Sequence, residues 1–240
     1  MVFILMRMNN RAEYVTLHGL FFGLERIFVA VCRISFDIAK LYKRGVYMRF
    51  HKEFALNPMI VFLFMFMLAN TVFIIITYQG LMTWLVIAIG VLLFGLFEYI
   101  THRYLLHEWP RLASTMYKGH MAHHEHPNEN KYLFGPARYD MVAYAIYYIV
   151  LLAITRSFHM SSAITLGSSS LQYYYQWMHF VAHRPIKIIT PWGRWMKKKH
   201  LLHHHMDEHA WYGVSNPVMD VIMGTNKPIR QSNHTNHSNQ

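Results

Sequence analysis

Ten of the 18 histidines in this chain fall into four short motifs whose spacing suits metal ligation. In chain order the motifs are H-x-x-x-x-H, H-x-x-H-H, H-x-x-x-H and H-x-x-H-H. Their members are His102 and His107; His120, His123 and His124; His179 and His183; and His200, His203 and His204. Neutral imidazole is a good ligand for iron, zinc and copper, whereas calcium and magnesium prefer oxygen. Ten nitrogen ligands exceed what one ion can hold, so the pattern predicts a dinuclear metal site.

Helical geometry explains the spacing of the last three motifs, because residues three or four apart lie on one face of an α-helix. Three pairs are therefore each expected to present two imidazoles together: His120/His123, His179/His183 and His200/His204. The adjacent residues His124 and His203 lie about 100° round the helix and are expected to reach a second ion.

The first motif has a different spacing. His102 and His107 are five residues apart, which places them about 140° from one another on an α-helix. Trp109-Pro110 comes directly after, and a residue before proline leaves the helical region. We therefore expect His107 to lie at a fraying helix end and to turn back toward the other histidines.

Composition indicates a membrane protein. The chain is 54% hydrophobic and only 15% charged, against roughly 25% charged residues in soluble domains. Asn57–Thr77 and Gly80–Ile100 are each long enough to cross about 30 Å of hydrocarbon. Only Tyr78-Gln79 separates them, so they are expected to form a hairpin of two transmembrane helices.

A second, less apolar pair extends over Tyr139–Thr155 and Met160–Val181. The latter segment has a polar middle and ends in an aromatic run, which is typical of a membrane interface. The predicted fold is an all-α integral membrane protein. It has about four transmembrane helices in two hairpins and a cytosolic, helical, histidine-rich cap.

The positive charges predict the orientation. No lysine or arginine occurs from Glu53 to His102, and Arg156 is the only one in the turn between the third and fourth spans. The remaining basic residues lie on the other side, which by the positive-inside rule is the cytosol. Both termini and the metal site are then cytosolic, in a bacterial inner membrane or the endoplasmic reticulum. The net charge of +11 fits this topology and anionic lipid, so no nucleic-acid partner is expected.

The pattern divides the chain into three regions. Residues 1–54 form an N-terminal cytosolic or interfacial segment, in which Leu17–Leu41 is expected to lie along the membrane surface. Residues 55–226 form the membrane domain with the dinuclear site. Residues 227–240 form a polar tail that is expected to be disordered. The basic run Lys197–Lys199 is expected to face the membrane surface or an electron donor.

The motifs and their order resemble the fatty acid hydroxylase/sterol desaturase superfamily of integral-membrane diiron oxygenases, and most closely its fatty acid 2-hydroxylase branch. The matching strings are Glu98–His107, Gly119–Pro127, His179–Pro185, His200–His204, Gly213–Pro217 and Gly224-Thr225. The resemblance covers about residues 55–226. Glu129 takes the place of an acidic residue that the branch shows two positions after the proline of the second motif. Met219-Asp220 stands where relatives often have Trp-Asp.

The resemblance implies an O₂-dependent oxidoreductase that hydroxylates a C–H bond of a lipid, expected to be a fatty acyl chain. Two iron ions would be held by the ten histidines, with zinc as a substitute in purified protein. Two electrons would come from an acidic electron-transfer protein of cytochrome b5 or ferredoxin type, together with its reductase. Glu98, Glu129 and Asp220 are candidates for carboxylates that orient the metal ligands.

Two alternatives remain open at this stage. One is a desaturase or a sterol or carotenoid oxidase of the same superfamily. The other is a non-catalytic metal-binding or metal-transport membrane protein. Transport predicts ionisable groups at mid-membrane depth, and the predicted spans hold almost none. The sequence therefore favours the enzyme.

Overall fold

The computed structural model describes residues 3–8, 11–16, 45 and 48–228. The chain divides into two units, residues 1–52 and 53–240. In the first unit, β1 (Phe3–Met8) and β2 (Arg11–Thr16) form an antiparallel hairpin that pairs Phe3 with Thr16. The predicted surface segment Leu17–Leu41 and nearly all of the predicted tail lie outside the described residues.

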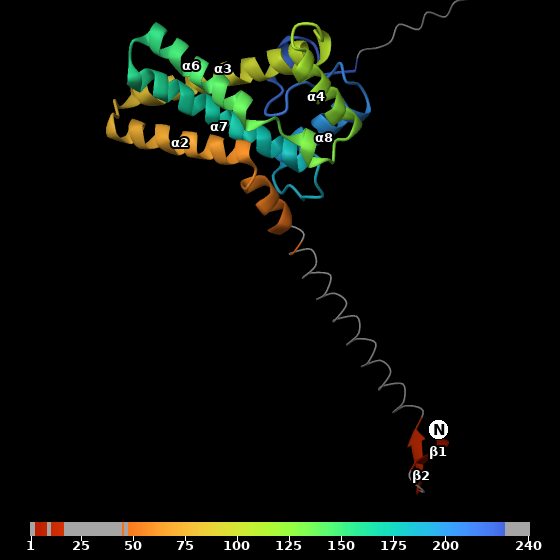
Figure 1. The fold of residues 1–240 in the computed structure, drawn as a ribbon. Helices are drawn as coiled ribbons and strands as arrows, with labels where there is room; N and C mark the ends of the chain where they lie inside the picture. The colour runs from red at the N-terminus through yellow and green to blue at the C-terminus, as the bar shows by residue number, and fades with distance from the viewer. Residues whose placement is uncertain (1–2, 9–10, 17–44, 46–47, 229–240) are drawn as a thin grey trace, which may run out of the picture. The chain divides into compact units, whose positions relative to one another are not determined.

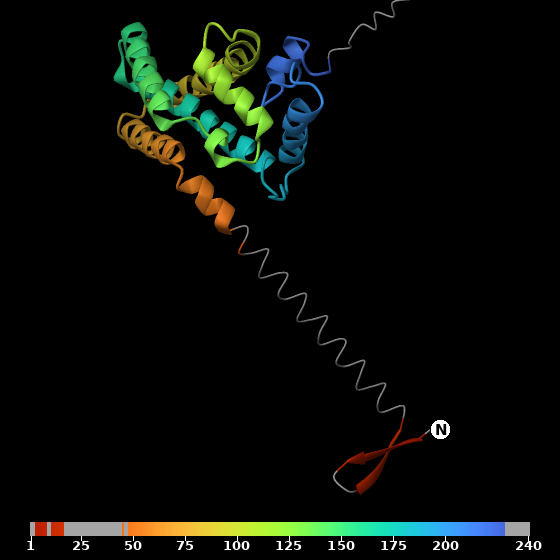
Figure 2. The same cartoon turned by 45° about the vertical axis from the view of Figure 1, so that its right-hand side comes forward.

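The described part of the second unit is all helical, as the sequence predicts. Its elements are α2 (Pro58–Ile76), α3 (Leu81–Ile100), η1 (Thr101–Glu108), α4 (Ser114–Glu125), α5 (Asn130–Leu133), α6 (Ala137–Thr155), α7 (Phe158–Ala182), α8 (Pro191–His205) and α9 (Val218–Ile222). The four long helices α2, α3, α6 and α7 lie side by side, and α4 and α8 gather at one end of this bundle (Figures 1 and 2). All four histidine motifs are at that end.

Two helix starts can be recognised in the sequence. Asn57 accepts a hydrogen bond from the backbone N–H of Met59 (3.0 Å) at the start of α2. Thr190 accepts one from the backbone N–H of Gly193 (3.2 Å) at the start of α8. Each cap is followed by a proline, whose missing N–H costs nothing in the first helical turn. The cap of α8 is therefore fixed ten residues before the first motif histidine of this helix, His200.

Three helical segments are long and apolar enough to cross a membrane: Pro58–Ile76, Leu81–Glu108 and Asn130–Thr155. Their outer faces carry large apolar side chains, among them Leu92, which is 73% exposed. Three of the four predicted spans are thus supported. The 25-residue α7 is not among the three, because serine, threonine and glutamine interrupt its apolar stretch.

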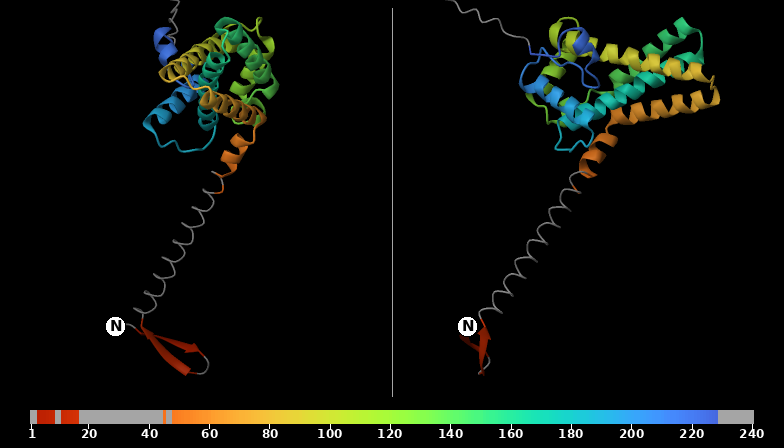
Figure 3. Two further views of the ribbon diagram at one scale, coloured as in Figure 1. Left: turned by 90° about the vertical axis from the view of Figure 1, so that its left-hand side faces the viewer. Right: turned by 180° about the vertical axis from the view of Figure 1, so that it is seen from behind.

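The polar side chains of α7 are buried inside the bundle, where α2, α3 and α6 pack around this helix (Figure 3). Ser168 donates a hydrogen bond to the carbonyl of Gly90 (2.9 Å) and lies 3.0 Å from the hydroxyl of Tyr147. Ser162 lies 3.0 Å from the hydroxyl of Tyr148. Since these groups bond to neighbouring helices, α7 can be polar without exposing that polarity to lipid.

Two glycines let α3 and α7 approach closely. A Cβ added at Gly90 would lie 2.0 Å from the carbonyl oxygen of Ile164, and one added at Gly167 would lie 2.0 Å from that of Ile87. Small residues allow backbones to approach in this way at helix interfaces in membranes. This crossing fixes α7, and with it His179 and His183, against the helix that leads into η1.

Candidate metal centre

The ten motif histidines gather into two groups of five. The first histidine group consists of His102, His107, His120, His124 and His203, and the second consists of His123, His179, His183, His200 and His204. Within each group, one ring nitrogen from each residue lies within 4.8 Å of those of the others. The groups adjoin, because the rings of His124 and His204 stack with centroids 4.1 Å apart.

Helices α4 and α8 each contribute to both groups, and they divide their H-x-x-H-H motifs in the same way. The residues four apart share a group, His120 with His124 and His200 with His204, while the middle histidine joins the other group. The expectation that His120 and His123 face one ion is therefore wrong. The pairs His179/His183 and His200/His204 do stay together.

The H-x-x-x-x-H motif lies on a π-helix, η1, rather than on a fraying α-helix. Hydrogen bonds in a π-helix join residues five apart, as the bond from the Trp109 N–H to the Tyr104 carbonyl does (2.7 Å). His102 and His107 consequently face the same way, with ring centroids 5.3 Å apart, and both are buried. The separation of about 140° assumed an α-helix and does not apply.

The ring nitrogens lie at the separations expected of ligands that share an ion. Nε2 of His120 lies 3.2, 2.9 and 3.1 Å from Nε2 of His102, His107 and His124. Two nitrogens at right angles, each about 2.1 Å from one metal ion, are about 3.0 Å apart. A neutral imidazole carries a single ring proton, so His120 cannot form three hydrogen bonds through one nitrogen. A cation satisfies all three contacts.

Unpartnered nitrogens point to the same conclusion. Nε2 of His203, in the first histidine group, and Nε2 of His204, in the second, are buried without a hydrogen-bond partner among the residues that the structure describes. Leaving a buried polar group unsatisfied costs about 1–3 kcal/mol. The donor set therefore fits two metal ions, one in each group.

The protonation state suits metal binding. Burial, reinforced by neighbouring imidazoles, lowers the pKa of His124 to about 3. The same causes hold the pKa of His203 well below its usual value. Both rings are therefore neutral at physiological pH and present a lone pair to a cation.

Two backbone carbonyls orient the first histidine group. The Nδ1–H of His102 donates to the Tyr212 carbonyl (2.6 Å), and that of His203 donates to the Ala210 carbonyl (2.8 Å). Such contacts fix the tautomer and leave Nε2 free for a metal. The loop of residues 210–216 thus fixes the orientation of two imidazoles, those of His102 and His203.

Two of the three candidate carboxylates hold this loop. Glu98 accepts hydrogen bonds from the N–H groups of Val214 (2.7 Å) and Ser215 (2.8 Å) and from the Ser215 hydroxyl. Asp220 accepts from the N–H groups of Tyr212 (2.9 Å) and Gly213 (2.8 Å). Both carboxylates are buried. They act on the histidines through the loop rather than by touching the rings.

Glu129 lies elsewhere. Its carboxylate is exposed and lies 4.0 Å from Nδ1 of His126, which is itself exposed. His205 and His209 are also exposed, and neither belongs to a histidine group. The expectation that Glu129 orients a ligand therefore has no structural support.

Two basic residues, Lys197 and Arg184, fix the turn carrying His183. Lys197 donates to the carbonyls of Val181 (2.6 Å), Arg184 (2.8 Å) and Ile186 (3.2 Å). Arg184 donates to the carbonyl of Asn128 (3.1 Å) and to the carboxylate of Glu53. The turn after α7 is thereby tied to α8, to the loop after α4 and to the segment before α2. Lys197 is consequently not part of a surface patch.

Comparison with known proteins gives a consistent result. A family model described as fatty acid hydroxylase matches residues 87–225, which include all ten histidines and the 210–216 loop. The chain is 26% identical over 149 residues to a dihydroceramide fatty acyl 2-hydroxylase of Arabidopsis thaliana, covering 58% of this chain and 60% of that protein. It is 25% identical over 143 residues to the ceramide very long chain fatty acid hydroxylase of Saccharomyces cerevisiae, covering 57% of this chain and 36% of that protein. The chain thus matches less than two thirds of either relative.

A solved structure shares the fold. Full-length scs7p, in which only the hydroxylase domain is visible, superposes with a TM-score of 0.60 at 23% identity. The match covers 69% of this chain and 65% of the other.

Proposed function

The chain belongs to the fatty acid hydroxylase family, and we propose that it is a membrane-bound, O₂-dependent diiron enzyme that hydroxylates a C–H bond of a lipid. The observation that carries the proposal is the pair of adjoining five-histidine groups at the end of a bundle with membrane-spanning helices. The names of the relatives refer to ceramide and fatty acyl hydroxylation. They support a fatty acyl chain as the substrate.

Iron suits the donor set, because imidazole nitrogen is a common ligand of ferrous iron. All ten histidines are proposed as ligands, five for each ion. Bound iron would supply the redox chemistry that activates O₂ for attack on an unactivated C–H bond. Zinc has the higher intrinsic affinity and can replace iron during purification.

The protein's own residues hold and orient this centre. The Tyr212 and Ala210 carbonyls fix the rings of His102 and His203, and the carboxylates of Glu98 and Asp220 fix the loop that carries these carbonyls. Seven of the ten histidines are buried, which restricts water at the centre. Pre-organised ligands of this kind avoid the cost of rearrangement during the reaction.

The proposed topology has four spans, with α7 as the fourth. The burial of its polar face and its length of 25 residues support this assignment. Both termini and the histidine groups would then be cytosolic, because the basic residues lie on that side. The two electrons would come from an acidic electron-transfer protein of cytochrome b5 or ferredoxin type with its reductase. The host membrane is a bacterial inner membrane or the endoplasmic reticulum.

Lipid mass spectrometry on cells expressing the chain with a candidate donor and reductase tests the proposal. The comparison is between wild type, His203→Ala and the matched control His205→Ala, whose histidine is exposed outside both groups. We expect a lipid one oxygen heavier than a known species with wild type and the control, and none with His203→Ala. A lipid lighter by two hydrogens would instead identify a desaturase. Identical lipids in all three strains would contradict an enzymatic role and favour a metal-binding protein.

A further inference from the structure

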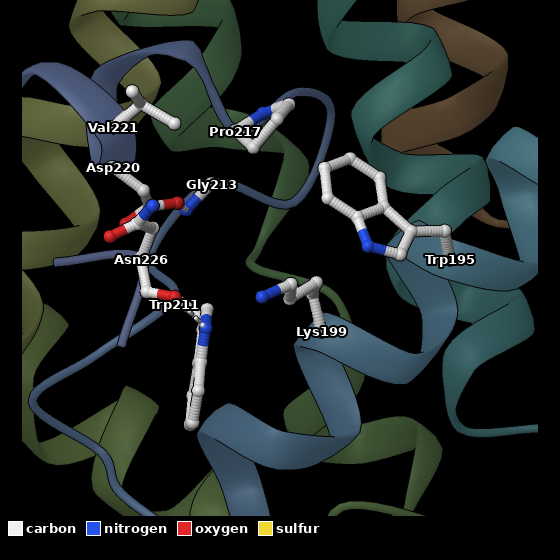
Figure 4. Close-up of a pocket in the computed structure, with 8 residues that line it drawn as sticks. All are labelled: Trp195, Lys199, Trp211, Gly213, Pro217, Asp220, Val221 and Asn226. Carbon is white, nitrogen blue, oxygen red and sulfur yellow. Dashed lines mark hydrogen bonds between the residues drawn. The ribbon is translucent and has the colours of Figure 1, made fainter. Parts of the chain in front are cut away.

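A pocket separate from the histidine groups lies between α8 and the segment of residues 211–226. Trp195 and Lys199 of α8 form one wall, and Trp211, Pro217, Asp220 and Val221 contribute to the others (Figure 4). The proposed hydroxylation assigns no task to this pocket.

The cation in the pocket is Lys199. Its Nζ lies 5.2 Å from the ring centroid of Trp211 and 5.7 Å from that of Trp195, so it has two indoles beside it. Within residues 48–228 no hydrogen bond or ion pair is formed by this ammonium, whereas Lys197, two residues earlier, donates three. Lys199 is therefore a partly buried positive charge available to an external anion.

Asp220 also lines the pocket, but its oxygens are engaged. They accept hydrogen bonds from the N–H groups of Tyr212 and Gly213 and from the hydroxyl of Thr225 (2.7 Å). Burial raises the pKa of Asp220, and its hydrogen bonds and the Lys199 charge oppose that rise. The two charges thus influence one another without forming an ion pair within 4.0 Å, and Asp220 serves the loop rather than the pocket.

The pocket adjoins the exposed apolar surface of α3 and α9. Asn216 packs against Gly95 of α3, with its Nδ2 3.4 Å from where a Cβ would be. Beyond Gly95, α3 still exposes apolar side chains, among them Phe97, which is 58% exposed. The adjacent α9 continues this surface with Val221 and with Ile222, which is 67% exposed. Acyl chains that lie on this surface would therefore bring a headgroup beside the pocket.

The α8 wall has the composition typical of a membrane interface. Trp192 and Trp195 are both exposed, and tryptophan is enriched where headgroups meet hydrocarbon. The basic surface here consists of Lys187, Arg194 and Lys198, which are exposed, and the half-buried Lys199. Residues 184–206 hold no acidic residue, and a basic surface beside apolar side chains attracts anionic lipid.

We propose that this pocket binds the phosphate headgroup of an anionic membrane phospholipid, with Lys199 as its cation and the acyl chains lying on the exposed apolar faces of α9 and α3. The lipid is a bound component of the enzyme and not its substrate. Because α8 carries three motif histidines, an occupied pocket would also stabilise the helix on which both histidine groups depend.

Native mass spectrometry of the full chain, purified in detergent and offered equimolar phosphatidylglycerol and phosphatidylcholine, tests the proposal. Wild type is expected to retain phosphatidylglycerol in preference to phosphatidylcholine. Lys199→Gln is expected to lower this preference roughly five-fold, the value of one lysine at an anionic surface. Lys199→Arg should keep it, and so should the control Lys198→Gln, which removes the same charge from an exposed position on α8.

A second variant covers the case in which Lys199→Gln fails to fold, which its metal content and melting temperature would reveal. Val221→Glu places a negative charge at the exposed rim of the pocket and should also abolish the preference. An unchanged preference in Val221→Glu, or in folded Lys199→Gln, would overturn the proposal. So would displacement of phosphatidylglycerol by inorganic phosphate at equal concentration, which would identify a site for free anions. These readouts are independent of hydroxylase activity, so the proposed function can fail without the lipid site failing.

Discussion

Oε1 of Glu98 lies 2.7 Å from the backbone nitrogen of Val214, although 116 residues separate the two in the chain. Glu98 is near the end of α3, one helical turn before His102. Val214 belongs to the same loop as Tyr212, whose carbonyl holds that histidine. Glu98 therefore anchors the same loop that orients His102, the predicted ligand one turn further along.

Replacement of Glu98 should expose this dependence. Glu98→Ala leaves two buried N–H groups and a hydroxyl without an acceptor, at a cost of about 1–3 kcal/mol for each. We expect lower thermal stability and a loss of metal from the first histidine group, so that metal analysis gives about one ion per chain instead of two. Glu98→Gln retains one acceptor oxygen, so its thermal stability and metal content should lie between those of wild type and Glu98→Ala. Glu129→Ala, at an exposed carboxylate, is the control. Full metal content in Glu98→Ala would show that the first histidine group does not depend on the contact between Glu98 and the loop.

The division of the histidines predicts group-specific metal loss. His107 belongs only to the first histidine group and His183 only to the second. Each single alanine variant should lower the metal content by about one ion per chain, and the double variant should remove nearly all of it. Metal analysis of protein purified without oxygen, with His209→Ala as the control, makes the measurement. Two ions in either single variant would show that the altered ring is not a ligand.

The crossing of α3 and α7 predicts a pair of opposite effects. Gly167→Ala forces a Cβ toward the Ile87 carbonyl, and overpacking of this kind costs about 1–3 kcal/mol, occasionally more. At Gly119 in α4 an added Cβ meets nothing within 4 Å. Gly119→Ala should therefore stabilise the protein, by up to about 1 kcal/mol, through helix propensity. Thermal unfolding in detergent, followed by tryptophan fluorescence, gives the melting temperatures of both variants. Equal melting temperatures for Gly167→Ala and Gly119→Ala would exclude a tight crossing of α3 and α7.

The buried imidazoles predict acid sensitivity of the metal-free protein. The pKa of His124 is lowered to about 3 in the folded chain and returns to about 6.5 on unfolding. Between these values the unfolded chain binds more protons, so folding stability falls as the pH drops below about 6.5. Melting temperatures of chelator-treated protein from pH 7.5 to pH 5 should decrease steadily, and His124→Ala should show a shallower decrease. A pH-independent melting temperature would contradict burial of neutral rings.

The sequence reveals the ten histidines because their spacing is local, and it reveals the apolar spans because hydropathy is local. It does not reveal which ring joins which group. His123 and His124 are neighbours in the chain and belong to different groups, and this depends on how α4 meets α7 and α8. Glu98 and Asp220 are identifiable as candidates, whereas the amides that they bind appear only when the loop is folded.

Two further features depend on packing. The serine-rich α7 resembles a marginal span because a hydropathy window cannot tell a side chain that faces lipid from one that faces another helix. Lys197 stands in a basic run that suggests a solvated surface, and only the position of three carbonyls around its ammonium shows otherwise. In both cases the sequence does not show which groups surround the side chain in the folded protein.

The π-helix between His102 and His107 also bears on insertions and deletions. Removal of one residue from positions 103–106 would leave H-x-x-x-H, a spacing at which an ordinary α-helix places both rings on one face. The ligand pair would survive such a deletion, and the residues after His107 would keep their direction, because they follow that ring along the helix. When the deleted residue is one of positions 104–106, Glu108 lies four residues after Arg103 instead of five, a spacing at which an α-helix also brings the two side chains of this ion pair together. The two motif spacings are therefore interchangeable, provided that the helix type changes with them.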